Sequence, residues 1–270
     1  MAIGILFWNK KILLALPLWI VIVCYWFSLP YQYSADTMNI LTLLAFAVAP
    51  GICIAVFIYH KDKHEPIGLL VKSFFYGMIS VGIALAISVL ISKFIPINDQ
   101  DLTEQAFHAF IIVALVEEFS KFIFVRGVLY RNTNFNEPFD GIVYSVMVSM
   151  GFATLENIMY VVDGGWDVAV LRMFTAVPAH ASFAVLMGYY LGLAKAVRQK
   201  SHYGWYALGI ATLLHGIYDY CWFISFIPGI WVWAIVSLAV GIILSRKAIK
   251  IHQDASPFQF HNTHKGETKD

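Results

Sequence analysis

Long apolar runs separated by short polar segments dominate the chain. Eight of these runs approach or exceed the roughly 20 mostly apolar residues that a helix needs to cross a bilayer. Proline stands between several of them, where helix breakers are expected. The predicted spans are 12–29, 40–60, 67–95, 104–130, 139–162, 168–196, 203–226 and 228–249. The pattern predicts an all-α, polytopic integral membrane protein with about eight transmembrane helices.

The polar segments between the runs are too short to hold a soluble domain. We therefore predict one transmembrane helical domain over residues 1–250, with its chemically interesting helices at about 104–226. Residues 251–270 are polar, and we expect them to form a flexible cytoplasmic tail.

Composition supports the membrane assignment. Hydrophobic residues make up 60% of the 270 residues and charged residues 13%, whereas soluble domains have roughly 45–50% and 25%. This excludes a disordered chain and disfavours a soluble enzyme. The formal net charge of +1 gives no electrostatic footprint for nucleic acid, so we expect no nucleic-acid partner.

The distribution of basic residues predicts the orientation of the chain. With eight spans and a cytoplasmic N-terminus, 14 of the 18 Lys and Arg residues fall in cytoplasmic segments. Only Lys93 and Arg172 fall on the opposite side. Such an asymmetry is the positive-inside signal, and it predicts that both termini are cytoplasmic.

Polar side chains inside the predicted spans are the functional signal. A charged residue at the centre of a membrane helix costs about 2.5–3.5 kcal/mol on insertion scales, so several together are not expected without a function. At about 1.5 Å per residue, the acids and histidines of four spans fall in one layer between the midplane and the outer leaflet. The candidate site residues are Glu117, Glu118, Lys121, Glu156, Asn157, His180, His215 and Asp219.

Spacing within two of these helices adds chemical detail. Lys121 follows Glu118 by three residues and Glu117 by four, so its ammonium can reach either carboxylate. Two adjacent carboxylates in a medium of low dielectric constant need such a cation to remain ionised. His215 and Asp219 are also four residues apart. This spacing suits a carboxylate that orients an imidazole, or two ligands of one metal ion.

The motifs between about residues 57 and 219 resemble the PrsW family of intramembrane proteases. They are Tyr59-His60-Lys61-Asp62-Lys63-His64-Glu65-Pro66, Glu117-Glu118-xx-Lys121, Glu137-Pro138-Phe139-Asp140-Gly141, Gly151-Phe152-Ala153-Thr154-Leu155-Glu156-Asn157, His180 followed by Gly188, and His215-Gly216-Ile217-Tyr218-Asp219. The family is similar to the CAAX-type prenyl proteases. Here Phe152-xxx-Glu156 stands in place of their FxxxH motif, and Asp219 in place of the asparagine in their HxxxN motif.

The resemblance implies a multi-pass protease of a bacterial plasma membrane. Its expected partners are the lipid bilayer and a single-pass membrane substrate similar to an anti-sigma factor, cut near the outer leaflet. We expect Glu117 to act as general base, with Glu118 and Lys121 adjusting its charge. The candidate ligands of zinc or another divalent metal are His180, His215, Asp219 and Glu156.

Three alternatives remain open at this point. In a metal-free mechanism, Glu117 is still the base and the histidines polarise the substrate carbonyl. A proton- or ion-coupled transporter also uses buried acids and histidines, although its charges should continue to the inner leaflet. A non-catalytic membrane scaffold would tolerate Glu117→Gln and Glu118→Gln.

Overall fold

The computed structural model describes residues 35–61, 65–197 and 202–255. All regular structure in these ranges is helical, which confirms the predicted all-α class. From Thr42 onward the chain forms one compact unit. A preceding unit covers Met1–Leu41, of which Ala35–Leu41, the first turns of helix α2, are described. The predicted span 12–29 and most of the predicted tail lie outside the described residues.

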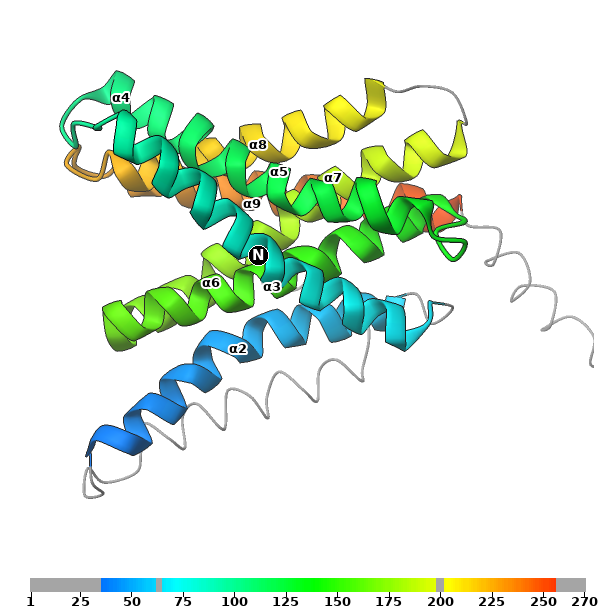
Figure 1. Cartoon of the computed structure of the whole chain (residues 1–270), viewed down its shortest axis with the longest axis horizontal. Helices are drawn as coiled ribbons and strands as arrows, with labels where there is room; N and C mark the ends of the chain where they lie inside the picture. Colours follow the sequence, from blue (N-terminus) through cyan, green and yellow to red (C-terminus); the bar gives the residue numbers. More distant parts are fainter. Residues whose placement is uncertain (1–34, 62–64, 198–201, 256–270) are drawn as a thin grey trace, which may run out of the picture. The chain divides into compact units, whose positions relative to one another are not determined.

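The helices follow the predicted runs closely (Figure 1). Residues Leu102–Arg131, predicted as a single span, form one helical stretch with changes of helical type. In chain order the elements are α2 (Ala35–Lys61), α3 (Ile67–Phe94), α4 (Leu102–Phe107), the π-helix η1 (His108–Leu115), α5 (Val116–Phe122), the π-helix η2 (Ile123–Val128), the 3₁₀-helix η3 (Leu129–Arg131), α6 (Pro138–Phe174), α7 (Ala176–Ala196), α8 (His202–Phe223) and α9 (Trp231–Asp254).

Local sequence explains where several helices begin. Asp101 caps α4, because its carboxylate accepts hydrogen bonds from the backbone N–H groups of Thr103 and Glu104. Pro138 occupies the first turn of α6, a position that needs no N–H donor. The side chains of Glu137 and Asp140 form a reciprocal capping box at the same end.

The connection between the fifth and sixth predicted spans differs from the prediction. Helix continues beyond residue 162 as far as Phe174, and the chain changes direction at Gly165 within α6. Gly165 has φ 67° and ψ −153°, a conformation that a residue without Cβ adopts at little cost. The predicted sixth span, 168–196, therefore corresponds to the segment of α6 after Gly165 followed by α7. The last span also begins later than predicted, at Trp231, and continues to Asp254.

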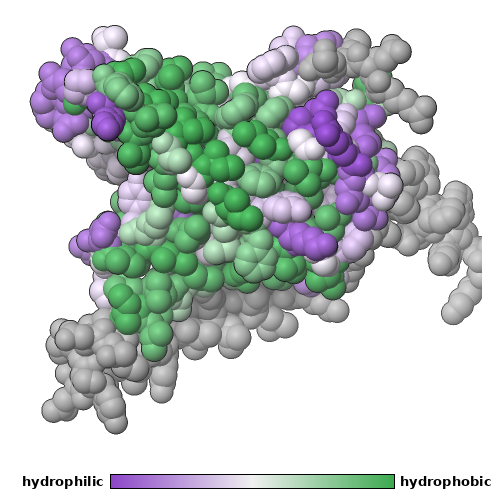
Figure 2. Space-filling view, viewed as in Figure 1, coloured by the Kyte–Doolittle hydropathy of each residue, from purple (hydrophilic) through white to green (hydrophobic). Residues whose placement is uncertain are grey.

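Four helical stretches among the described residues are long and apolar enough to cross a membrane: Ile40–His60, Ile67–Phe94, Pro138–Ala196 and Trp231–Asp254. Large apolar side chains are exposed on them, including Phe75 and Leu90 on α3 and Trp233 on α9. Figure 2 shows a broad hydrophobic face with hydrophilic residues gathered toward its ends. These features identify a multi-pass membrane protein, since a soluble protein rarely exposes so large an apolar surface.

Helix α6 lies at the centre of the unit and packs against both α3 and α7. Its first half is buried on nearly every side. The approach to α7 is close enough that a Cβ on Gly188 would collide with the carbonyl oxygen of Gly141. Because the α6–α7 backbones meet so closely, side chains that follow Gly141 on α6 and precede Gly188 on α7 are held in a defined register.

Candidate active site

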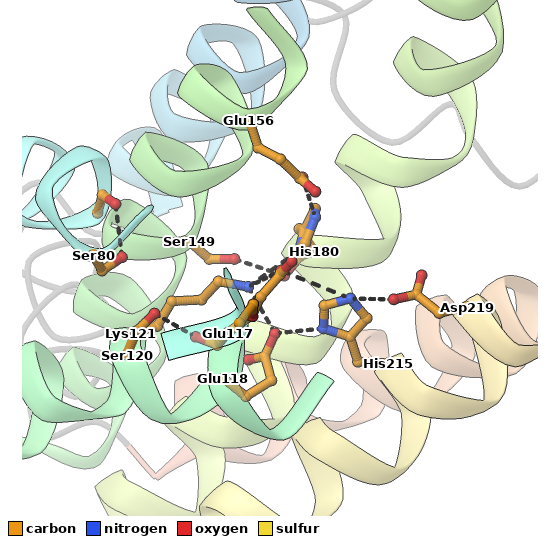
Figure 3. Close-up of polar contacts among 12 residues, drawn as sticks. Ser80, Glu117, Glu118, Ser120, Lys121, Ser149, Glu156, His180, His215 and Asp219 are labelled. Carbon is orange, nitrogen blue, oxygen red and sulfur yellow. Dashed lines mark hydrogen bonds and ion pairs between the residues drawn. The ribbon is translucent and has the colours of Figure 1, made fainter. Parts of the chain in front are cut away.

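Helix α5 places three charged side chains in the interior (Figure 3). Lys121 Nζ donates a hydrogen bond to Glu118 Oε1 at 2.7 Å and lies 3.7 Å from Glu117 Oε2. The Glu118 and Lys121 side chains are 1% and 2% exposed, and Glu117 is 13% exposed. The i,i+3 and i,i+4 contacts predicted from the sequence are therefore present. Two π-helical segments, η1 and η2, flank α5; such segments are common near functional sites.

His180 on α7 lies between Lys121 and Glu156. Its Nε2 is 2.9 Å from Glu156 Oε2, and its Nδ1 is 3.2 Å from Lys121 Nζ. An ionised carboxylate only accepts hydrogen bonds and an ammonium only donates them. His180 therefore donates through Nε2–H to Glu156 and offers the lone pair of Nδ1 toward α5.

His215 on α8 faces carboxylates with both ring nitrogens. Nδ1 is 2.9 Å from Glu118 Oε1, and Nε2 is 3.1 Å from Asp219 Oδ2. Glu117 Oε2 lies 3.9 Å from the same Nε2. The Phe183 ring stacks on the imidazole, with centroids 5.0 Å apart. The His215–Asp219 pair predicted from its spacing is therefore present, and Glu118 adds a second partner from another helix.

A further set of polar contacts surrounds Glu156. Arg172 donates to Glu156 Oε2 from Nη2 at 2.8 Å and to Asn157 Oδ1 from Nε at 2.8 Å. Asn157 in turn donates through Nδ2 to the carbonyl oxygen of Ala47 on α2, at 3.0 Å. Asn157 thus contacts Arg172 and the α2 backbone and is linked to His180 only through Arg172 and Glu156.

The donor set of Glu117, His180 and His215 fits a metal ion. One ligand atom from each of the three side chains lies within 4.8 Å of the others. Two histidines and a carboxylate are a donor set found in catalytic zinc sites. Glu117 Oε2 is buried without a hydrogen-bond partner among the described residues, so a cation would satisfy it.

The charge balance of the cluster also favours a divalent cation. In the metal-bound state, in which both histidines would be neutral ligands, four carboxylates face two cations, which leaves two negative charges in excess. The carboxylates are Glu117, Glu118, Glu156 and Asp219, and the cations are Lys121 and Arg172. Buried charges are stable only when they are paired, and a divalent ion supplies the missing charge.

All eight predicted site residues are brought into one connected network from α5, α6, α7 and α8. The three side chains that could bind a metal ion, Glu117, His180 and His215, differ from the predicted ligand set in one respect. Their carboxylate is Glu117, whereas Glu156 contacts His180 and Asp219 contacts His215.

Sequence reasoning missed several residues that contact the site. Arg172 binds Glu156 and Asn157 but is not among the predicted site residues. Ser149 donates to the His180 carbonyl at 3.0 Å, and the Phe152 ring centroid lies 4.0 Å from Lys121 Nζ. The helical spacing could have predicted that Ser149 and Phe152 lie near the site, because residues 149, 152 and 156 share one face of a helix at i, i+3 and i+7. Phe183 follows His180 by three residues, and this spacing likewise places the two side chains on one face of the helix.

Comparison with known proteins agrees with this geometry. The family profile described as "PrsW family intramembrane metalloprotease" matches residues 65–244. "Protease PrsW" of Geobacillus kaustophilus is 37% identical over 182 residues, which cover 66% of this chain and 79% of that protein. "Protease PrsW" of Bacillus subtilis is 34% identical over 66% of this chain and 81% of its own length. "Protease PrsW" of Clostridioides difficile is 32% identical over 76% and 87%.

No solved structure matches the chain. The family match covers α3 to most of α9 and includes every residue of the polar cluster. It decides between the functional classes that the sequence left open, in favour of a peptidase over a transporter or a scaffold. The chain belongs to the PrsW family of intramembrane metalloproteases.

Proposed function

We propose that the protein hydrolyses a peptide bond of a single-pass membrane protein at the His180–His215–Glu117 cluster. The observation that carries this proposal is the convergence of two buried imidazoles and one partly exposed carboxylate within 4.8 Å. Three helices contribute these side chains, and each imidazole has a carboxylate partner. Such partners orient metal-ligating histidines in known sites.

His180 and His215 would hold the metal through nitrogen, with Glu117 as the carboxylate that faces it. Zinc is the ion that this donor set favours. When bound, the metal would polarise the scissile carbonyl and make a coordinated water acidic enough to ionise near neutral pH. Glu156 holds the His180 ring through Nε2, and Glu118 holds the His215 ring through Nδ1.

Glu117 is the general base in this proposal. Glu118 is held by both Lys121 and His215, whereas Glu117 Oε2 has no hydrogen bond and its side chain is the more exposed of the two. Glu117 can therefore accept a proton from a water and transfer it to the leaving amine. Lys121 balances the adjacent carboxylates, so that Glu117 can be ionised within a buried site.

The site is proposed to act near the outer leaflet of a bacterial plasma membrane, with both termini in the cytoplasm. The excess of basic residues in the predicted cytoplasmic segments supports this orientation. Glu156 precedes the turn at Gly165 by nine residues, about 13 Å of helix at about 1.5 Å per residue. A substrate similar to an anti-sigma factor would then be cut close to its outer membrane boundary.

Cleavage of a tagged single-pass reporter with a short outer domain would test the proposal. The reporter is co-expressed with wild type, Glu117→Gln or Glu104→Gln, and its fragments are separated on a gel. Glu104→Gln is the matched control, because Glu104 is an exposed carboxylate on the same helical stretch. We expect the fragment with wild type and the control but not with Glu117→Gln, at equal protein level. A fragment that persists with Glu117→Gln would contradict the assigned base.

A further inference from the structure

Arg172 connects the two arms of α6 on either side of Gly165. It lies on the segment after the turn, and its partners Glu156, Asn157 and Tyr160 lie on the arm before it. Its side chain is 15% exposed. The contact therefore joins the end of the helix that carries Glu156 to the segment that leads into α7, where His180 lies.

The guanidinium group makes three kinds of contact at once. One N–H group binds Glu156 Oε2 at 2.8 Å and another binds Asn157 Oδ1 at 2.8 Å. The group also lies over the Tyr160 ring, with Cζ 3.9 Å from the centroid. A planar group with several fixed donors can hold two acceptors and stack at the same time, whereas an ammonium cannot reproduce this geometry.

The oxygen of Glu156 that Arg172 binds is the same oxygen that His180 contacts. Glu156 Oε2 accepts from Arg172 at 2.8 Å and lies 2.9 Å from His180 Nε2. Both contacts fix the carboxylate in one rotamer, and the carboxylate fixes the imidazole ring. With Nε2–H directed at Glu156, the Nδ1 lone pair faces Lys121 on α5, beside Glu117 and Glu118.

We propose that Arg172 is a positioning residue, which acts through Glu156 to hold His180 with Nδ1 directed at the catalytic cluster. This inference rests on the proposed function, because it concerns the nitrogen that His180 would offer to a metal. Arg172 contacts none of the reacting groups itself. A purely structural Arg172 would tie the two arms of α6 together without affecting the His180 ring.

The state of the His180 ring can be measured directly in the full-length, metal-free protein in detergent. Histidine is labelled with ¹⁵N, and the His180 signals are assigned by their loss in His180→Gln. In the wild type we expect the proton on Nε2 and an unprotonated Nδ1. In Arg172→Met we expect this signature to be replaced by a mixture of ring states. Arg172→Lys, which keeps the charge but not the two-acceptor geometry, should lie between them and guards against misfolding of the methionine variant.

Arg126→Met is the matched control, since Arg126 also stacks on a tyrosine, with Cζ 4.1 Å from the Tyr130 ring centroid. It should leave the His180 signals unchanged. Identical His180 signals in wild type and both Arg172 variants would overturn the proposal. So would a wild-type ring protonated on Nδ1.

Metal affinity gives a second readout, with Co²⁺ as the probe. Loss of a residue that orients a metal-ligating histidine typically weakens binding by about 10–100-fold, and we expect this range for Arg172→Met. Equal Co²⁺ affinity in wild type and Arg172→Met would contradict the proposal. If the wild type binds no Co²⁺, the proposed metal function fails, while the ring signals still decide the role of Arg172.

Discussion

Replacing Lys121 with methionine should strongly destabilise the protein, because it leaves buried carboxylates without their nearest cation. Lys121 Nζ lies 2.7 Å from Glu118 Oε1 and 3.7 Å from Glu117 Oε2. The Lys121 and Glu118 side chains are 2% and 1% exposed, so water cannot screen the remaining charge. Methionine has a similar length and preserves the packing against Phe152.

The expected magnitude follows from this burial. Removing one partner of a buried ion pair costs about 3–5 kcal/mol. For a protein of this size, about 2–4 °C of melting temperature per kcal/mol converts this loss to a decrease of roughly 6–20 °C. Glu118→Gln should also destabilise, because it leaves the ammonium without its closest carboxylate. The double variant should lose much less than the sum of the single losses, since neither charge is then left alone.

Thermal unfolding in detergent, followed by tryptophan fluorescence with a chelator present, measures the four proteins of this double-mutant cycle. Lys72→Met is the matched control, because Lys72 is exposed on α3 and should shift the melting temperature little. A Lys121→Met shift no larger than that of Lys72→Met would show that the buried ion pair of Lys121 does not stabilise the fold. Losses for Lys121→Met and Glu118→Gln that add within about 0.5 kcal/mol would refute the coupling between the two residues.

Two further predictions concern the base and the helix contact. Glu117→Gln should reduce cleavage by about 10²–10⁴-fold, because an amide cannot accept a proton from the attacking water; undiminished cleavage by purified Glu117→Gln protein would contradict the assigned base. Gly188→Ala should destabilise by at least about 1–3 kcal/mol, since its Cβ meets the Gly141 carbonyl oxygen; Gly82→Ala, where the added Cβ meets no atom within 4 Å, should not destabilise, and equal melting temperatures would argue against the close α6–α7 contact.

The parts of the site that could be predicted from the sequence are those that depend on one helix. Lys121 reaches Glu117 and Glu118, and His215 reaches Asp219, because three and four residues along a helix bring side chains together. The convergence of acids and histidines from four helices could also be expected, since their positions along the predicted spans place them at similar depths.

Contacts between different helices could not be predicted from the sequence pattern. Hydropathy gives the length of a span but not its rotation about its own axis. The pairing of His180 with Glu156 and of His215 with Glu118 depends on the rotation and register of α5, α6, α7 and α8. The close approach of Gly188 to Gly141 is one determinant of that register.

The turn between the two arms of α6 illustrates the same limit. The apolar runs predicted a break between residues 162 and 168, and the structure has it at Gly165. The predicted span 168–196 includes most of the short helix after the turn but treats it as one helix with α7, whereas the structure ends α6 at Phe174 and begins α7 at Ala176. The apolar runs do not show that the chain turns back at Gly165 and brings Arg172 to Glu156.

Reversible dependence of cleavage on metal would show directly that the protein cuts its substrate at a metal site. Purified protein is treated exhaustively with a chelator, its metal content is measured, and cleavage of a purified single-pass reporter is followed before and after Zn²⁺ is added. We expect activity to disappear with the metal and to return as Zn²⁺ approaches one ion per chain. Full activity in protein that contains no detectable metal would contradict the proposed metal-dependent mechanism.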